Sequence, residues 1–169
     1  MVRNILLAVA CSGLLVSNAV AQDRAPAIAN FGAIAPIDGH AVQPDPELRY
    51  RVVFSITEAS PAGGVNRSLE KVARYLNLLA AGNVRAEAGD IVAVIHGPAT
   101  PILSNAADNP NLELIAALND AGVTIAVCSQ AMHRAQLSAD NLAPGVRIDA
   151  SALTTLTTLQ LRGWAVVYD

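Results

Sequence analysis

The chain has 169 residues, of which 53% are hydrophobic and 15% are charged, and its formal net charge is −3. This length suits one domain, and the apolar content excludes wholesale disorder, because enough surface can be buried to offset chain entropy. The small negative charge argues against nucleic-acid binding, and two cysteines are too few for a disulfide-stabilised scaffold.

The N-terminal residues have the three-part pattern of a secretory signal peptide. Arg3 is followed by an apolar stretch from Ile5 to Val16 and then by Ala19-Val20-Ala21, a small-x-small cleavage site. We therefore expect residues 1–21 to be a signal peptide that is cleaved after Ala21. The mature protein would be periplasmic or secreted, with no stable membrane insertion once the signal has been removed.

Cleavage would also remove Cys11 and leave Cys128 as the single cysteine of the mature chain. An exported protein with one cysteine cannot form an internal disulfide. The thiol of Cys128 is then buried and inert, paired with another chain, or used chemically.

Residues 22–48 are rich in alanine and proline and show neither helical nor strand periodicity, so we expect an extended arm. Several of its side chains are apolar, among them Phe31 and Ile34. A loose linker and an arm docked on the body or on a neighbouring subunit both fit this composition.

Residues 49–169 alternate between strand and helix patterns, which predicts a single α/β domain. Apolar, β-branched segments predict strands over 50–56, 91–95, 123–127 and 164–168, with a short fifth at 146–148. Apolar residues at three- and four-residue spacing predict helices over 66–81, 112–118 and 151–161. Such alternation implies right-handed crossovers and a mostly parallel sheet that is covered on both faces.

Polar side chains follow three of the predicted strands, where the carboxyl ends of a parallel sheet form the usual functional crevice. Glu58 follows the first strand, His96 the second and Cys128 the third. If these strands are neighbours, an imidazole and a carboxylate come within reach of the thiol. A helix N-terminus or an imidazolium beside Cys128 would lower the thiol pKa and favour a reactive thiolate.

Structural roles explain the same residues as well. A cysteine at the end of a buried strand is most often a small apolar residue, and His96 before Gly-Pro can cap a turn. Glu58 in a loop is compatible with simple solvation. Cys128, His96 and His133 match no common metal-ligand spacing, so we expect neither a metal site nor a cofactor.

The ordered residues from Tyr50 to Asp169 resemble the DsrE/DsrF-like family, in its broad YchN-like group. The matching stretches are Val52-Val53-Phe54, Asn66, Ala73-Arg74, Asn77-Leu78, Val94 to Ala99, Gly122-Val123, Val127 to Gln130, Leu142 to Val146, Ser151-Ala152-Leu153, Leu159-Gln160 and Gly163-Trp164. The resemblance implies a three-layer α/β/α domain with a parallel sheet of five strands. It also implies assembly into homo-oligomers, often trimers or hexamers, and an association with sulfur metabolism.

The resemblance further implies a role for particular residues. Members of the sulfur-relay branch carry sulfur as a persulfide on a cysteine, which corresponds to Cys128 here. Many exported relatives have Cys-Gly-Gln where this chain has Cys128-Ser129-Gln130. A protein that donates or accepts sulfur would then be a partner.

Three functions remain open from the sequence. The first is an exported sulfur carrier, at most a transferase-like protein, in which Cys128 takes up sulfane sulfur and His96 orients the thiolate. The second is a non-catalytic homo-oligomeric module whose clefts, lined by residues such as Asn66, hold a small ligand or a soft metal. The third is a structural protein with an inert Cys128. Glu58, Asn66, Ser129 and Gln130 are the candidate binding residues.

The last predicted helix offers an argument for self-association. Its leucines, Leu153, Leu156, Leu159 and Leu161, are more numerous than one face against a sheet requires. They form either a subunit interface or part of the core.

Overall fold

The computed structural model describes residues 26–35, 39 and 41–169. The signal peptide expected over residues 1–21 lies outside these residues, as does the beginning of the expected arm. Within the described part of the chain, no helix is long and apolar enough to cross a membrane.

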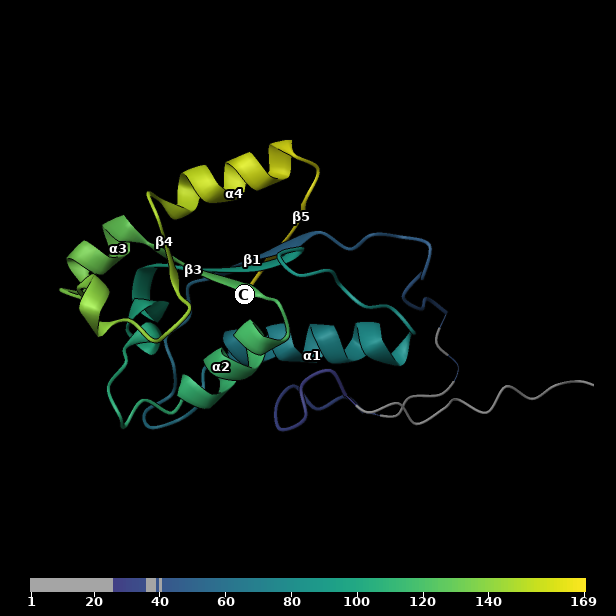
Figure 1. Ribbon diagram of the computed structural model, residues 1–169, viewed down its shortest axis with the longest axis horizontal. Coiled ribbons are helices and arrows are strands. Elements are labelled where there is room, and N and C mark those ends of the chain that lie inside the picture. The colour runs from purple at the N-terminus through teal and green to yellow at the C-terminus, as the bar shows by residue number, and fades with distance from the viewer. Residues whose placement is uncertain (1–25, 36–38, 40) are drawn as a thin grey trace, which may run out of the picture.

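Five parallel strands form one sheet with the order β4-β3-β2-β1-β5 (Figure 1). The strands are β1 (Val52–Ile56), β2 (Ile91–Ile95), β3 (Thr124–Cys128), β4 (Arg147–Asp149) and β5 (Ala165–Tyr168). The central strands β1 and β2 are buried on both faces, which explains their continuous apolar sequence. The predicted α/β fold is confirmed, and the sheet is parallel throughout.

Helices cover both faces of the sheet and complete the three layers (Figure 1). They are α1 (Arg67–Ala81), α2 (Leu112–Asp120), α3 (Ser129–Arg134) and α4 (Ala152–Leu161). The helices α1 and α2 lie on one face, α4 lies on the other, and α3 follows directly from β3. Two 3₁₀ segments, η1 (Gly97–Leu103) and η2 (Ala139–Asn141), were not predicted, because their short sequences have no helical periodicity.

Side-chain caps determine where α1 and α4 begin. The Oδ1 of Asn66 accepts the N–H of Leu69 at 2.8 Å, and the Oγ of Ser151 accepts the N–H of Leu153 at 3.2 Å. Each bond satisfies one of the N–H groups that the first turn of a helix leaves without an intrahelical partner.

Residues 26–35 of the expected arm dock on α1, which decides between the two possibilities left open by their composition. The buried side chain of Asn77 accepts the N–H of Ile28 at 2.8 Å and donates to three arm carbonyls at 2.9–3.2 Å. Gly32 approaches the helix so closely that an added Cβ would lie 2.1 Å from the backbone nitrogen of Arg74. The arm is therefore packed on its own chain over these residues.

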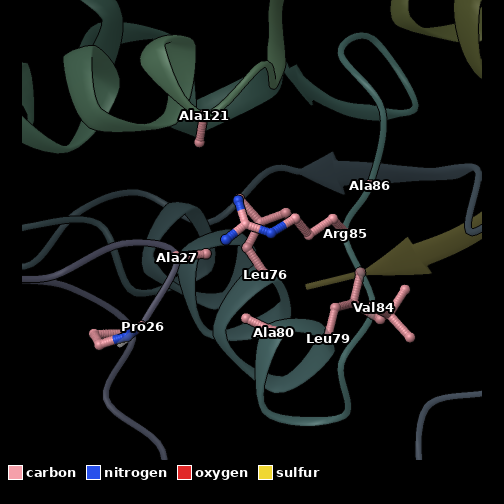
Figure 2. Close-up of a pocket in the computed structure, with 9 residues that line it drawn as sticks. All are labelled: Pro26, Ala27, Leu76, Leu79, Ala80, Val84, Arg85, Ala86 and Ala121. Atoms are coloured by element: carbon pink, nitrogen blue, oxygen red, sulfur yellow. The ribbon is translucent and has the colours of Figure 1, made fainter. Parts of the chain in front are cut away.

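The docked arm, the end of α1 and the segment leading into β2 enclose a cavity of about 290 Å³ (Figure 2). Its lining is mostly apolar, and Arg85 is the charged residue that reaches across it. Because α1 runs back from the end of β1 to the start of β2, this cavity lies at the amino edge of the sheet.

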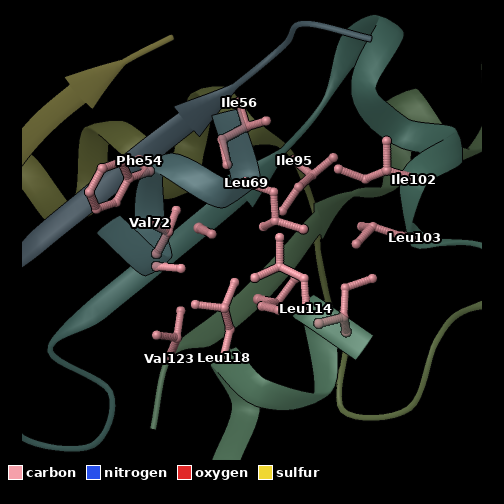
Figure 3. Packing of buried hydrophobic residues seen from close by; sticks show 14 of the residues in the cluster. Phe54, Ile56, Leu69, Val72, Ile95, Ile102, Leu103, Leu114, Leu118 and Val123 are labelled. Carbon is pink, nitrogen blue, oxygen red and sulfur yellow. The ribbon is translucent and has the colours of Figure 1, made fainter. Parts of the chain in front are cut away.

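Two cores of unequal size lie on the two faces of the sheet. The larger core, between the sheet and the helices α1 and α2, includes Phe54, Leu69 and Leu114 (Figure 3). The smaller core lies under α4, which buries only Ala152 among its own residues. Much of α4 therefore remains exposed to solvent in the single chain.

The four leucines of α4 divide between these two environments. Leu156 and Leu159 pack against the smaller core, whereas Leu153 and Leu161 are 78% and 84% exposed. Two of the leucines considered for an interface therefore contribute to the core.

Candidate functional site

Cys128 and His96 lie side by side at the carboxyl edge of the sheet. In the parallel register of β2 and β3, Ile95 pairs with Val127, so the next residues along the two strands are His96 and Cys128. Ile95 and Val127 point into the larger core. Successive side chains alternate between faces, and therefore Cys128 and His96 project toward the α4 side.

Four donor groups lower the pKa of the Cys128 thiol. They are the backbone N–H groups of Ala152, Ala131 and Gln130 and the hydroxyl of Ser151. Burial of the thiol raises its pKa, but these donors stabilise the thiolate more, so the pKa of Cys128 falls below its ordinary value of 9.0. Only 6% of the residue is exposed, and the thiolate is thus stabilised by the protein rather than by water.

Ser129 links the two chain segments that supply these donors. Its Oγ donates to the carbonyl of Ala150 at 2.8 Å, which joins the first turn of α3 to the residues before α4. The side chain of Gln130 is exposed, and its Nε2 lies 3.4 Å from the Oγ of Ser129. Ser129 therefore affects the site indirectly, by fixing the backbone at Ala150 near the start of α4. Gln130 affects it through its backbone N–H, which lowers the pKa of the Cys128 thiol.

His96 is hydrogen-bonded to Ser55, a residue of β1 that is 4% exposed. The Nε2 of the imidazole and the Oγ of the serine are 2.9 Å apart. Burial lowers the pKa of His96, and the negative charge of Asp169 opposes this only in part, so the pKa lies below the ordinary 6.5. The imidazole beside the thiol is accordingly neutral at pH 7.

Asp169 was not among the predicted site residues. It follows β5, and its carboxylate accepts the N–H groups of Thr57 and Glu58, both at 2.6 Å, and the hydroxyl of Thr57 at 2.9 Å. Burial raises the pKa of this carboxyl, whereas these three donors and the backbone N–H of Asp169 itself lower the pKa, which lies below 3.8 overall. Asp169 directly follows the last predicted strand, so the rule that selected Glu58 and His96 from the carboxyl ends of strands could also have selected Asp169.

The remaining two candidates lie apart from the thiol. Glu58 is in the loop after β1 with an exposed side chain, and its backbone carbonyl accepts the Nδ2 of Asn66 at 2.7 Å. Asn66 is fully buried, caps α1, and donates its backbone N–H to the Oδ1 of Asn111 at 2.7 Å. Its polar atoms are thus occupied within the chain, on the face of the sheet opposite to Cys128.

A cavity of about 360 Å³ lies between η1 and α3, and its lining includes Ala131, which is three positions after Cys128 on the chain. Its lining consists of Gly97, Pro98, Pro101, Ala131, Arg134 and Ala135. Gly97 directly follows His96, and the backbone N–H of Ala131 is among the groups that lower the pKa of Cys128. In the described part of the chain, no group of three or more acidic, cysteine or histidine side chains is arranged to hold a metal ion.

The DsrE/DsrF-like family model matches residues 51–168, the whole span of the sheet. The chain belongs to the DsrE/DsrF-like family. Membership of this family implies a role of the sulfur-relay type, and the match includes both Cys128 and His96.

Two solved structures share the fold of this DsrE/DsrF-like domain. The protein of unknown function MTH1491 from Methanobacterium thermoautotrophicum is 26% identical and superposes with a TM-score of 0.58. The ychN protein from E. coli is 18% identical, with a TM-score of 0.55. Each alignment covers 71% of this chain and 99% of the other. No curated protein matches the sequence.

Proposed function

We propose that this protein is an exported sulfur carrier that holds sulfane sulfur as a persulfide on Cys128. The observation that carries the proposal is the set of four donors around the sulfur, together with the lowered thiol pKa that results. A cysteine that serves only as a small apolar core residue gains nothing from such donors, whereas a reactive cysteine needs them. The environment of Cys128 thus favours the chemical role over the structural one.

The uptake step requires no reactant besides a donor persulfide. The Cys128 thiolate attacks the outer sulfur of the donor, a bond forms between Sγ and that sulfur, and the donor S–S bond breaks. Its electron pair leaves on the donor as a thiolate. The bound outer sulfur would be an anion, and the donors of the first turn of α3 and of the start of α4 would remain near it.

His96 would orient the thiolate and receive the proton that an incoming thiol or persulfide releases. Its neutral imidazole is suited to accept a proton, and its position next to Cys128 in the strand register supports this role. The hydrogen bond to Ser55 holds the ring in place.

The proposal includes export, a homo-oligomeric state such as a trimer or hexamer, and a second protein that donates or accepts the sulfur. Support for self-association comes from α4. It contains no charged residue, yet its two most exposed leucines, Leu153 and Leu161, face solvent in the single chain. A second copy of the chain would cover this apolar face.

The test uses the chain from residue 22 onward, in which Cys128 is the single cysteine. We expect incubation with polysulfide or thiosulfate to add about 32 Da to the intact mass, and dithiothreitol to remove it. Cys128→Ala should show no adduct while retaining its circular dichroism spectrum. An unmodified wild-type protein, or an equal adduct on Cys128→Ala, would contradict the proposal.

A further inference from the structure

We infer that the cavity between η1 and α3, which is lined by the residue after His96 and by Ala131 in the first turn after Cys128, selects small organic persulfides that carry a carboxylate, and that Arg134 is the residue that recognises this carboxylate. The inference rests on the proposed function and specifies its donor. Its basis is the lining of the cavity, the charge of α3 and the distance along the helix between Arg134 and the thiol.

The lining of the cavity combines apolar walls with one charge. Apart from Arg134, its lining residues are Gly97, Pro98, Pro101, Ala131 and Ala135, and none of these side chains is polar. A volume of about 360 Å³ suits a small organic molecule rather than a bare ion. Such a site binds an aliphatic chain by contact and one anionic group through its guanidinium.

The charge of Arg134 is not balanced locally. Neither α3 nor η1 contains an acidic residue. Among the described residues, the ion pairs join Arg49 with Glu87 and Asp90, and Arg147 with Asp149, so Arg134 is outside them. Its exposed guanidinium is therefore available for a carboxylate, with which it can form two parallel hydrogen bonds.

The spacing along α3 determines where the carboxylate must be in the donor. Arg134 is six positions after Cys128, which corresponds to roughly 9 Å of helix rise. A carboxylate several bonds away from the reacting sulfur, as in a short peptide thiol, can thus reach Arg134 while its outer sulfur meets Cys128. Arg134 would position the donor without touching the reacting atoms.

The experiment compares two donors that differ in their carboxylates, glutathione persulfide and its diethyl ester. The rate of the mass adduct on Cys128 is measured with each donor at low ionic strength. We expect the acid to react about tenfold faster than the ester on the wild-type protein. In R134Q the two rates should become similar, whereas R51Q should keep the preference, because Arg51 precedes β1 at the opposite edge of the sheet.

A second measurement depends on binding alone. S-methylglutathione has both carboxylates but no reactive sulfur. When added together with glutathione persulfide, it should slow formation of the mass adduct on Cys128 in the wild-type protein but not in R134Q. Equal rates for the two donors on wild type, or a preference that persists in R134Q, would overturn the inference and leave the carrier function intact. If neither donor modifies Cys128, the proposed function fails and this inference with it.

Discussion

At Cys128, burial and hydrogen bonding act on one sulfur in opposite directions. Burial favours the neutral thiol, whereas the N–H groups and the hydroxyl that point at the sulfur favour the thiolate and prevail. A thiolate that is stabilised in this way is also a good leaving group, because its low pKa lets it depart readily when an acceptor takes the outer sulfur. The same donors would therefore serve both the uptake and the release of sulfur in the proposed carrier.

The hydroxyl of Ser151 is the one of these donors that a side-chain substitution can remove. We expect Ser151→Ala to raise the thiol pKa of Cys128, since the three backbone donors remain and the fourth is lost. The pH at which alkylation by iodoacetamide reaches half its maximal rate should rise accordingly. Below that pH the variant should react more slowly than wild type, because a smaller fraction of the thiol is ionised.

Ser138→Ala is the matched control, because Ser138 is exposed and bonds to Asn141 rather than to the thiol. Its alkylation profile should coincide with that of wild type. A Ser151→Ala profile that also coincides with wild type would show that the hydroxyl does not act on the thiolate.

At the scale of elements, α1 is packed on two sides, against the sheet and against the arm. Its apolar stripe, including Leu69 and Val72, faces the larger core. Asn77 faces the arm instead and satisfies four backbone groups of that segment. This second contact explains why α1, whose other buried residues are mostly apolar, has a buried asparagine.

Gly32 allows the arm to come close to α1, and Gly32→Ala should weaken the docking. The added methyl group would meet the backbone at Arg74, which cannot rotate out of the way as a side chain can. We expect a loss of about 1–3 kcal/mol of stability, the usual cost of leaving buried hydrogen-bond partners unsatisfied. Hydrogen exchange at residues 26–35 should become faster in the variant.

Gly39→Ala provides the comparison for backbone strain. Gly32 and Gly39 both have positive φ, at 64° and 75°, but nothing lies within 4 Å of the Cβ position of Gly39. If both variants lose the same stability, the effect comes from strain in the left-handed region and not from contact with α1.

At the scale of the whole molecule, the two faces of the sheet are covered to different degrees. The face under α1 and α2 has the larger core, while α4 covers the other face with a single fully buried residue, Ala152. The edge strand β5 is also partly exposed on this side, and Tyr168, which pairs with Ser55, is 65% accessible. The α4 side is therefore the side on which a second copy is expected.

Replacing Leu153 and Leu161 with lysine should reduce the proposed oligomer to a monomer. Charged side chains at these two exposed positions would have to be desolvated in an apolar interface, at a cost that exceeds the gain from assembly. Light scattering coupled to size-exclusion chromatography measures the mass. Val42→Lys, at an exposed apolar residue of the arm, should leave it unchanged. A wild-type monomer, or an intact oligomer in the double variant, would exclude α4 as the interface.

The fold could be predicted from the sequence because its signals are local. The apolar runs of β1, β2 and β3 and the periodic stripe of α1 each lie in one short segment, and the five strands were located to within two residues. The family resemblance led to the same fold. The segment η1 was missed, because a short 3₁₀ turn containing prolines has no periodicity to detect.

The candidate site could be predicted only in part. The rule for strand ends selected Cys128 and His96, which do come together, and also Glu58. It could not identify Ser55 or Asp169 as neighbours of His96, because these residues are 41 and 73 positions away along the chain and meet it only through the order of the strands.

Sequence by itself determined the fold class and singled out Cys128 as the one cysteine that remains if residues 1–21 are the expected signal peptide, since both depend on composition and local pattern. Tertiary structure decided which groups of the chain lie near the thiol of that cysteine. The amides of Gln130 and Ala152 reach one sulfur because the crossover through β4 brings the start of α4 back beside the end of β3. A thiolate is stabilised by donors that lie close to it in space. Whether they do depends on the packing of segments that are far apart in the sequence.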